Sequence, residues 1–206
     1  MNIAIIGNDK AFEEAMAKLG HHQYFRADRI TLKLISQSFD VLFDFTVDWN
    51  VDSIELYKSV TAAVFLNTIL TTHRLVTEKL KTQGSIFGFC GFPTFFNRGR
   101  IEVVVQESDK EELKNILNRL NVEYTLVKDQ VGMVTPRVVC MVINEAYGAL
   151  QQGVATREDI DLSMKLGTNY PYGPFEWGEM IGMDNLKNLM LALKDSTIDA
   201  RFNPNF

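Results

Sequence analysis

The most constraining feature of this sequence is a regular alternation of short apolar runs with helix-like stretches over residues 1–127. Residues 2–6 are nearly all apolar and end at Gly7, which is typical of a buried parallel strand. Residues 10–19 follow with helical spacing, and Gly20 closes that helix. We expect further strands at 23–26, 41–46, 62–66, 85–89, 101–106 and 124–127, and helices at 51–59, 71–81 and 111–120. The alternation predicts an α/β domain with a mainly parallel sheet.

The pattern changes after Asp129, where helical spacing replaces the apolar runs. Pro136 is compatible with a helix here only if it lies in the first turn. One face of this helix is predicted to consist of Val134, Val138, Val142, Ala146 and Leu150.

Capping residues divide the rest of the chain into further helices. Thr156 is expected to cap a second helix, with Asp159 at the reciprocal position of a capping box, and Gly167 is expected to end it. Pro174 can open a third helix, and residues 186–193 continue as a fourth. We therefore predict an α/β domain over residues 1–128 and an all-helical domain over residues 129–206.

Composition excludes several classes of protein. The formal net charge of -5 gives no electrostatic support for nucleic-acid binding, and no basic run suggests an anionic membrane surface. The apolar runs are too short for a membrane span, and the N-terminus has no signal-peptide pattern, so we expect a soluble cytoplasmic protein. The only cysteines, Cys90 and Cys140, lie outside any CxxC or metal-ligand cluster, which predicts free thiols and no metal site.

A series of motifs from Lys128 to Asp184 resembles the C-terminal domain of 3-hydroxyacyl-CoA dehydrogenases. In order, these motifs are Val127-Lys-Asp-Gln-Val-Gly-Met-Val-Thr-Pro-Arg, Asn144-Glu-Ala, Gly153-Val-Ala-Thr-Arg-Glu-Asp-Ile-Asp, Met164-Lys-Leu-Gly, Tyr170-Pro-Tyr-Gly-Pro-Phe-Glu and Ile181-Gly-Met-Asp. The resemblance implies a Rossmann-like NAD domain followed by a helical domain that forms a homodimer through residues 129–206 and closes over an acyl-CoA.

The N-terminal half resembles the same family at fewer positions. Its strand, Gly7 and helix match the opening of the family's NAD domain, and residues 63–68 match the strand that leads into the family's Ser-Asn-Thr-Ser. Residues 88–102 match the family's Gly-x-His-Phe-Phe-Asn-Pro…Val-Glu-Val without a gap. The resemblance implies cofactor contacts from Gly7 and Asn67; the alternatives are a strand-to-helix turn at Gly7 and a strand-end turn at Asn67.

The dinucleotide loop departs from the family's GxGxxG pattern. It reads Gly7-Asn8-Asp9-Lys10-Ala11-Phe12, so the second glycine is Asp9 and the third is Phe12. An aspartate repels a pyrophosphate, and a phenylalanine is bulky where helix and strand must approach closely. The ribose acid aligns with Ala27, beside Asp28. The sequence therefore argues against NAD binding in the family's usual mode.

The residues at the catalytic positions also differ from those of the family. Cys90 stands in place of the family's histidine base, Glu102 matches its orienting carboxylate, and Pro136 stands in place of an asparagine. The family's last serine of Ser-Asn-Thr-Ser is Ile69, and a helical hairpin that helps to hold the CoA is missing before Asp40. The alternatives are a buried apolar role for Cys90 and a surface position for Glu102.

Two aromatic residues and a histidine remain. His73 could replace the missing base, although a surface histidine is the simpler interpretation. Trp177 and Tyr172 are expected to pack in the core or at the dimer interface.

Three hypotheses follow from these residues. The first is a dimeric binding or regulatory protein, a pseudoenzyme that keeps the scaffold without the dehydrogenase reaction. The second is a working NAD-dependent 3-hydroxyacyl-CoA or 3-hydroxybutyryl-CoA dehydrogenase of fatty-acid metabolism. The third is different chemistry through Cys90, which requires a depressed thiol pKa.

Overall fold

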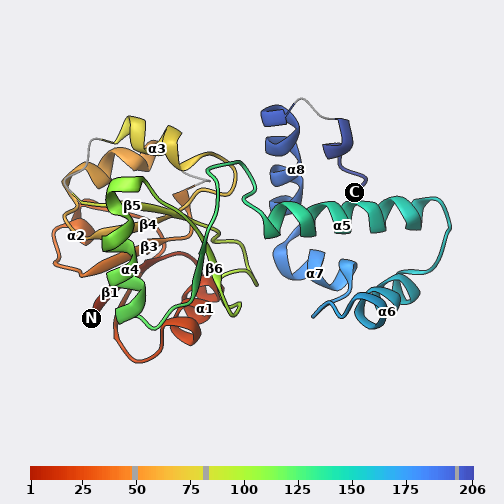
Figure 1. Ribbon diagram of the computed structural model, residues 1–206, viewed down its shortest axis with the longest axis horizontal. Helices are drawn as coiled ribbons and strands as arrows, with labels where there is room; N and C mark the ends of the chain where they lie inside the picture. Colours follow the sequence, from red (N-terminus) through yellow and green to blue (C-terminus); the bar gives the residue numbers. More distant parts are fainter. Residues whose placement is uncertain (48–50, 81–83, 198–199) are drawn as a thin grey trace. The chain divides into compact units, whose positions relative to one another are not determined.

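The computed structural model describes residues 1–47, 51–80, 84–197 and 200–206. It divides into two compact units, Met1–Met133 and Val134–Phe206 (Figure 1). The sequence predicts the boundary at residues 128–129, so the short segment before Val134 lies with the first unit rather than with the helices. Among the described residues, no helix is long and apolar enough to cross a membrane.

The first unit is an α/β domain, as the alternating pattern predicts. Its strands and helices are β1 (Asn2–Ile6), α1 (Asp9–Leu19), β2 (Gln23–Ala27), α2 (Leu32–Ile35), β3 (Val41–Asp44), a 3₁₀ helix (Val51–Ser59), β4 (Ala63–Asn67), α3 (His73–Lys79), β5 (Ile86–Phe89), β6 (Ile101–Val104), a short 3₁₀ turn (Glu107–Asp109), α4 (Lys110–Arg119) and β7 (Tyr124–Leu126). The expected strands are confirmed in order. The helix expected at 51–59 takes 3₁₀ geometry.

The strands form one sheet in the order β2-β1-β3-β4-β5-β6-β7. Neighbouring strands run parallel except for β5 and β6, which are antiparallel. The chain passes from β1 to β2 on one side and to β3 on the other, so the strand order reverses between β1 and β3. The carboxyl ends at such a switch point are where open α/β sheets bind ligands.

Helices cover both faces of this sheet, which explains why its central strands are almost continuously apolar. α1 and α4 pack on one face, over a core that includes the rings of Phe43, Phe65, Phe87, Phe89 and Phe96. α2, α3 and the 3₁₀ helix pack on the other face, where Leu34, Tyr57 and Val76 meet alternate strand residues.

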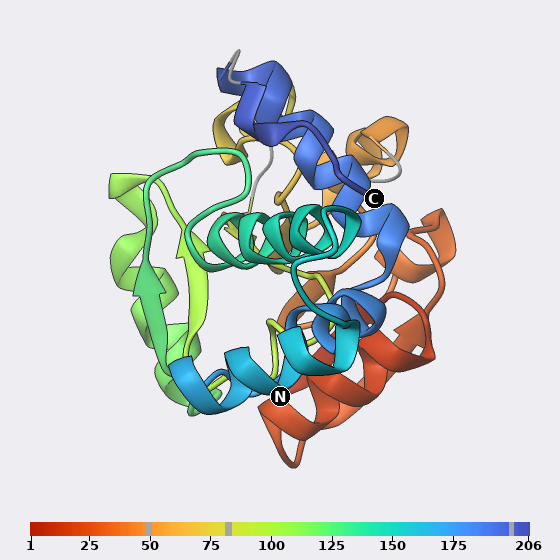
Figure 2. The ribbon, with the colours of Figure 1, turned by 90° about the vertical axis from the view of Figure 1, so that its right-hand side faces the viewer.

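The second unit is all-helical, as predicted (Figures 1 and 2). It contains α5 (Thr135–Gln151), α6 (Arg157–Thr168), α7 (Pro174–Ile181), α8 (Met183–Thr197) and a 3₁₀ turn (Ala200–Phe202). Pro136 lies in the first turn of α5 and Pro174 opens α7. The Thr156 hydroxyl caps α6 by accepting from the Asp159 N–H at 3.2 Å.

Two details of the helical prediction are wrong. Gly167 lies inside α6, which ends instead at Asn169 in the left-handed conformation (φ 55°), a conformation that asparagine tolerates. The apolar face predicted for α5 is only partly buried, because Val134 and Val138 are 53% and 52% exposed whereas Ala146 is 6% exposed. The other buried residues of α5 lie on the adjacent face, which includes Val139 and Ile143, because α7 and α8 pack there.

Candidate active site at the carboxyl edge of the sheet

Gly7 makes the tight connection between β1 and α1. Its N–H donates to the Ala27 carbonyl at 2.9 Å. A Cβ at this position would lie 3.0 Å from the Ala11 Cβ and 3.4 Å from the Phe45 Cβ, so a larger residue would push the strand and helix apart. The structure therefore places Gly7 in the tight strand-to-helix turn that a dinucleotide-binding fingerprint requires of its first glycine.

The N-terminus of α1 is engaged by the chain's own side chains. The Asn8 amide oxygen accepts from the Ala11 N–H at 2.9 Å, which caps the helix. The Asp9 carboxylate forms an ion pair with Arg26, whose guanidinium also bonds Asp28 at 2.9 Å. Two carboxylates thus surround one arginine beside the position where the family holds a pyrophosphate. These residues do not fit NAD in the family's binding mode.

Asp44 is a buried acid that the sequence analysis missed. It ends β3, next to β1, and is fully buried. One carboxylate oxygen accepts from the Thr46 N–H at 2.6 Å and the Thr46 hydroxyl at 2.7 Å, and the other accepts from the Tyr57 hydroxyl. Burial raises the pKa of Asp44, and burial followed by the nearby Asp44 raises the pKa of Tyr57 well above its usual value. The sequence pattern that could have identified Asp44 is a single aspartate at the end of an otherwise apolar strand.

Asn67 joins the ends of three strands. Its side chain is fully buried; the amide nitrogen donates to the Phe45 carbonyl at 3.1 Å, and the amide oxygen accepts from the Gly91 N–H at 3.0 Å. A Cβ on Gly91 would lie 2.9 Å from the Asn67 Cγ, so the loop after β5 comes very close. The amide that the resemblance assigns to a cofactor is thus bonded within the protein.

Cys90 and Glu102 each lie one residue beyond the antiparallel pairs of β5 and β6. Gly88 pairs with Val104 and Phe89 with Val103, so continuing this register by one residue sets Cys90 opposite Glu102. Residues directly opposite in an antiparallel pair have Cβ atoms about 5 Å apart. Cys90 is 6% exposed and Glu102 is half-buried. Cys90 follows the last paired residue of β5, so the juxtaposition that the resemblance implies stays a prediction from the register.

His73 is not on the surface, contrary to the simpler sequence interpretation. Its ring is 3% exposed, and Nε2 lies 2.8 Å from the Ile86 carbonyl. Burial lowers the pKa of His73, which the hydrogen bond to Ile86 partly opposes. A neutral imidazole that donates to a backbone carbonyl has a structural role, because its bonded nitrogen faces the sheet.

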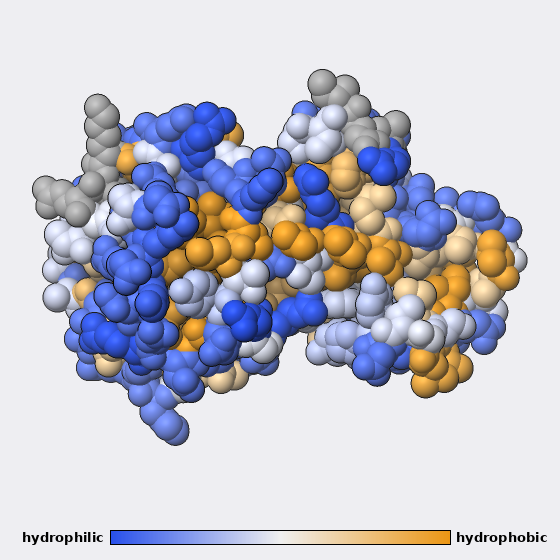
Figure 3. All heavy atoms as spheres, viewed as in Figure 1, coloured by the Kyte–Doolittle hydropathy of each residue, from blue (hydrophilic) through white to orange (hydrophobic). Residues whose placement is uncertain are grey.

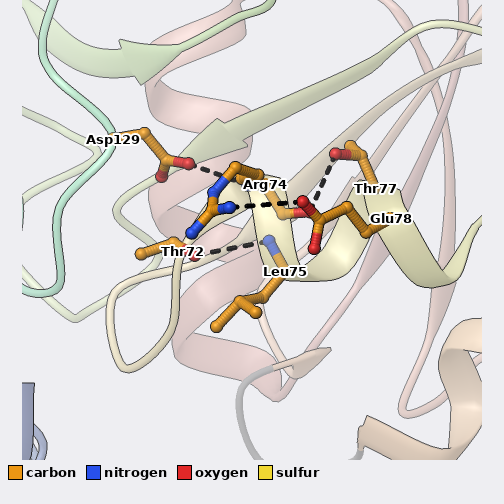
Figure 4. Close-up of polar contacts among 6 residues, drawn as sticks. All are labelled: Thr72, Arg74, Leu75, Thr77, Glu78 and Asp129. Carbon is orange, nitrogen blue, oxygen red and sulfur yellow. Dashed lines mark hydrogen bonds and ion pairs between the residues drawn. The ribbon is translucent and has the colours of Figure 1, made fainter.

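Asp129 ties the segment after β7 to the start of α3. Its carboxylate accepts from the backbone N–H groups of His73 and Arg74, each at 2.8 Å. Figure 4 draws the bond to Arg74. The Thr72 hydroxyl caps the same helix by accepting from the Leu75 N–H at 3.3 Å. The Gly132 N–H donates to the Ile69 carbonyl at 2.8 Å. These bonds explain why residues 129–133 belong to the first unit.

The remaining predicted residues lie in the second unit. Pro136 is buried in the first turn of α5. Trp177 is 4% exposed and contacts the rings of Tyr170 and Tyr172, so the prediction of core packing is confirmed. Among the described residues of both units, no group of three or more His, Cys, Asp or Glu residues is arranged to hold a metal ion.

Comparison with known proteins identifies the second unit. Residues 132–206 match the family model of the 3-hydroxyacyl-CoA dehydrogenase C-terminal domain. The chain is 45% identical to 3-hydroxyadipyl-CoA dehydrogenase of Escherichia coli over 78 residues, which cover 38% of this chain and 16% of that protein. It is 37% identical to 3-hydroxybutyryl-CoA dehydrogenase of Clostridioides difficile over 91 residues, which cover 44% and 31%. These matches span about a third or less of the relatives' length.

Solved structures extend the likeness of fold to nearly the whole chain. The (S)-3-hydroxybutyryl-CoA dehydrogenase of Ralstonia eutropha superposes with a TM-score of 0.75 at 20% identity, covering 99% of this chain and 90% of that one. FadB2 of M. tuberculosis gives a TM-score of 0.76 at 16% identity, covering 98% and 90%. Residues 132–206 thus match the C-terminal domain of the 3-hydroxyacyl-CoA dehydrogenases, and the chain as a whole shares the fold of these solved structures.

Proposed function

We propose that this protein no longer carries out hydride transfer and serves as a binding or regulatory protein on a dehydrogenase scaffold. The observation that carries the proposal is the N-terminus of α1, where Asn8 caps the helix and Asp9 brings a carboxylate held by Arg26. A dinucleotide pyrophosphate would have to approach that carboxylate, in a loop that lacks the second and third glycines.

The catalytic positions support the same proposal. The family reaction needs a general base for the 3-hydroxyl group and polar groups around the developing oxyanion. A thiol such as Cys90 has a reference pKa about two units above that of imidazole, and it offers no second nitrogen for Glu102 to orient. Pro136 has no side-chain donor. Loss of one such group typically reduces the rate by a factor of about 100 or more.

We further propose that the protein is a cytoplasmic homodimer formed through residues 129–206. Apolar side chains lie exposed on the second unit, with Leu162 at 52% and Leu166 at 78%, and α6 has no buried residue. Figure 3 shows apolar surface gathered over parts of this unit. A sizing column with light scattering tests the dimer, and a clean monomer at micromolar concentration would refute it.

The competing function is an active NAD-dependent dehydrogenase of 3-hydroxyacyl-CoA substrates, with a place in fatty-acid metabolism. One specific observation favours it: extending the register of β5 and β6 by one residue would set a protonatable side chain, Cys90, opposite Glu102. The names of the matched relatives point to the same substrate class, acyl-CoA esters with a 3-hydroxyl group. Under this alternative, Gly7 and Asn67 would contact the cofactor.

One preparation tests both functions. NADH is titrated by its fluorescence, and reduction of acetoacetyl-CoA is followed by the loss of NADH absorbance, with an active 3-hydroxybutyryl-CoA dehydrogenase as positive control. We expect neither binding nor turnover. Saturable NADH binding with turnover that Glu102→Gln abolishes would overturn the proposal. Asp9→Gly serves as the matched variant: restored NADH binding would identify the Asp9 carboxylate as the cause of the loss.

A further inference from the structure

One face of α5 holds an extended segment of the chain in a set of amide contacts. Asn144, Gly148 and Gln151 are spaced four and three residues apart, so they share that face of the helix. The segment they contact is Asn203-Pro204-Asn205-Phe206, which follows the 3₁₀ turn. Figures 1 and 2 both show the end of the chain beside α5.

Asn144 recognises the backbone of this segment at two points. Its amide nitrogen donates to the Asn203 carbonyl at 3.1 Å, and its amide oxygen accepts from the Asn205 N–H at 2.7 Å. Asn144 is 4% exposed, so both ends of a buried amide are satisfied by one short segment. A side-chain amide that bonds a carbonyl and an N–H two residues apart selects an extended backbone, as a neighbouring β-strand would.

The side chain of Asn205 makes one further hydrogen bond: its amide nitrogen donates to the backbone carbonyl of Asn144 at 3.1 Å. The backbone carbonyl of Asn205 accepts from the Gln151 side-chain amide. This approach depends on Gly148, because a Cβ there would lie 3.0 Å from the Asn205 amide nitrogen. The groove therefore accommodates an asparagine at this position, and an alanine at 148 would force the Asn205 amide to shift by a few tenths of an ångström.

The final aromatic residue completes the contact. The Phe206 ring lies 5.3 Å from the Tyr147 ring, which also meets Phe175 at 4.9 Å. Pro204 fixes its own φ and limits the freedom of the segment before it binds. The contacts thus specify both the conformation and the sequence of their occupant.

We infer that this face of α5, formed by Asn144, Tyr147, Gly148 and Gln151, is a peptide-binding site whose ligand is an extended Asn-Pro-Asn-Phe segment. Residues 203–206 fill the site within one chain, and the same segment of a second copy fits it in exchange. The inference goes beyond the proposed function and does not depend on it, because none of these four residues is one of the cofactor or catalytic positions.

A labelled peptide tests the site in the full-length chain. The probe is a fluorescent peptide that spans residues 200–206, and its anisotropy is followed as protein is added. In the wild type, the chain's own segment competes at an effective concentration on the order of millimolar. The double variant Asn205→Ala, Phe206→Ala should release that segment, so we expect it to bind the peptide at least about tenfold more tightly. A folded double variant with no gain in affinity would overturn the inference.

Gly148→Ala supplies the specific test of the groove. When it is added to the double variant Asn205→Ala, Phe206→Ala, it should weaken peptide binding about tenfold, which is the effect of losing one or two hydrogen bonds. We expect this loss even though alanine stabilises the helix itself. Gly167→Ala is the matched control, because it also replaces a helical glycine and its Cβ would meet nothing within 4 Å. Equal binding by both variants would contradict the assignment.

A second measurement applies even if the released variant does not fold. Amide exchange at Asn205 is followed by NMR in the full-length wild type and in Gly148→Ala. We expect protection in the wild type and at least about fivefold faster exchange in the variant, because the Asn205 N–H is bonded to buried Asn144. Unprotected exchange in the wild type, or no change in the variant, would refute the docked segment.

Discussion

The hydrogen bond from Tyr57 to the buried Asp44 carboxylate makes the sharpest test of how the first unit is stabilised. Tyr57→Phe removes the hydroxyl and leaves the ring in its apolar surroundings on the α2 face of the sheet. The cost should therefore come from the hydrogen bond rather than from lost packing. A hydrogen bond to a charged group contributes about 1.5–3 kcal/mol, so we predict that the free energy of unfolding falls by about 2 kcal/mol near pH 7.

The effect should depend on pH because Asp44 titrates. Burial raises its pKa in the folded state, and the bond from Tyr57 opposes that rise. When burial raises the pKa of an acid in the folded state, protonation of that acid favours the folded state. This contribution to the free energy of unfolding is fully present below the unfolded pKa of about 3.9, and it is lost as the pH rises through the folded pKa. Tyr57→Phe should raise the folded pKa further. Its destabilisation should therefore be larger near pH 7 than near pH 4.

Urea unfolding followed by far-UV circular dichroism at both pH values measures this difference. Because the protein has two units, hydrogen exchange of peptides that cover β3 should accompany it, to assign the change to the first unit. Tyr24→Phe is the matched control, since its hydroxyl donates at 2.6 Å to an exposed backbone carbonyl and not to a carboxylate. A loss below about 0.5 kcal/mol for Tyr57→Phe, or an equal loss at both pH values, would refute the role given to this bond.

Three further predictions concern single residues. Gly173→Ala would set a Cβ 2.3 Å from the Cγ of Asp161, whose carboxylate caps α7 by accepting two backbone N–H groups at 2.8 and 3.2 Å, so thermal unfolding should show a loss of about 1–2 kcal/mol. Asn67→Ala should cost about 2–4 kcal/mol in urea unfolding, because it leaves two buried backbone groups without their bonds; a loss under 1 kcal/mol would contradict its role as a tie. Burial raises the pKa of Cys140 to about 12, so its thiol should resist iodoacetamide at about pH 8 until urea unfolds the chain, and rapid labelling of the native protein would argue against that burial.

The order of the elements could be predicted because each follows from contacts close in sequence. A strand buried on both faces needs an apolar run, and Gly7 and Gly20 mark where strand and helix end. Thr156 and Pro174 identified helix starts for the same reason, since capping chemistry is local.

The errors arose where distant partners decide the outcome. The inner face of α5 depends on where α7 and α8 pack, so Val134 and Val138 could not be assigned from their spacing alone. His73 is buried because the Ile86 carbonyl and the carboxylate of Asp129 meet it from other parts of the chain. No local pattern marks such contacts.

The candidate site was predicted in part, by resemblance rather than by periodicity. The aligned β5 and β6 motif predicts that Cys90 lies opposite Glu102, and the antiparallel pairs of Gly88 with Val104 and Phe89 with Val103 are what that prediction extends. The internal bonds of Asn67 and Asp44 could not be predicted, because the side-chain types alone do not tell whether an amide or carboxylate faces a ligand or a neighbouring strand end.

Asn8, Asn67 and Asp129, which lie along the carboxyl edge, are each bonded within the chain, whereas the buried Thr68 hydroxyl has no hydrogen-bond partner among the described residues. Asn8 accepts from the first turn of α1, Asn67 links three strand ends, and Asp129 caps α3. A ligand that used these groups would first have to break bonds that each contribute about 0.5–1.5 kcal/mol, and would recover only the difference. At α5 the balance is different, because the bonds to residues 203–206 come from a short segment that an identical segment can replace bond for bond. Replacing residues 203–206 by an identical segment leaves no polar group without a hydrogen-bond partner. We therefore expect α5 to bind a peptide more favourably than the carboxyl edge of the sheet binds a ligand.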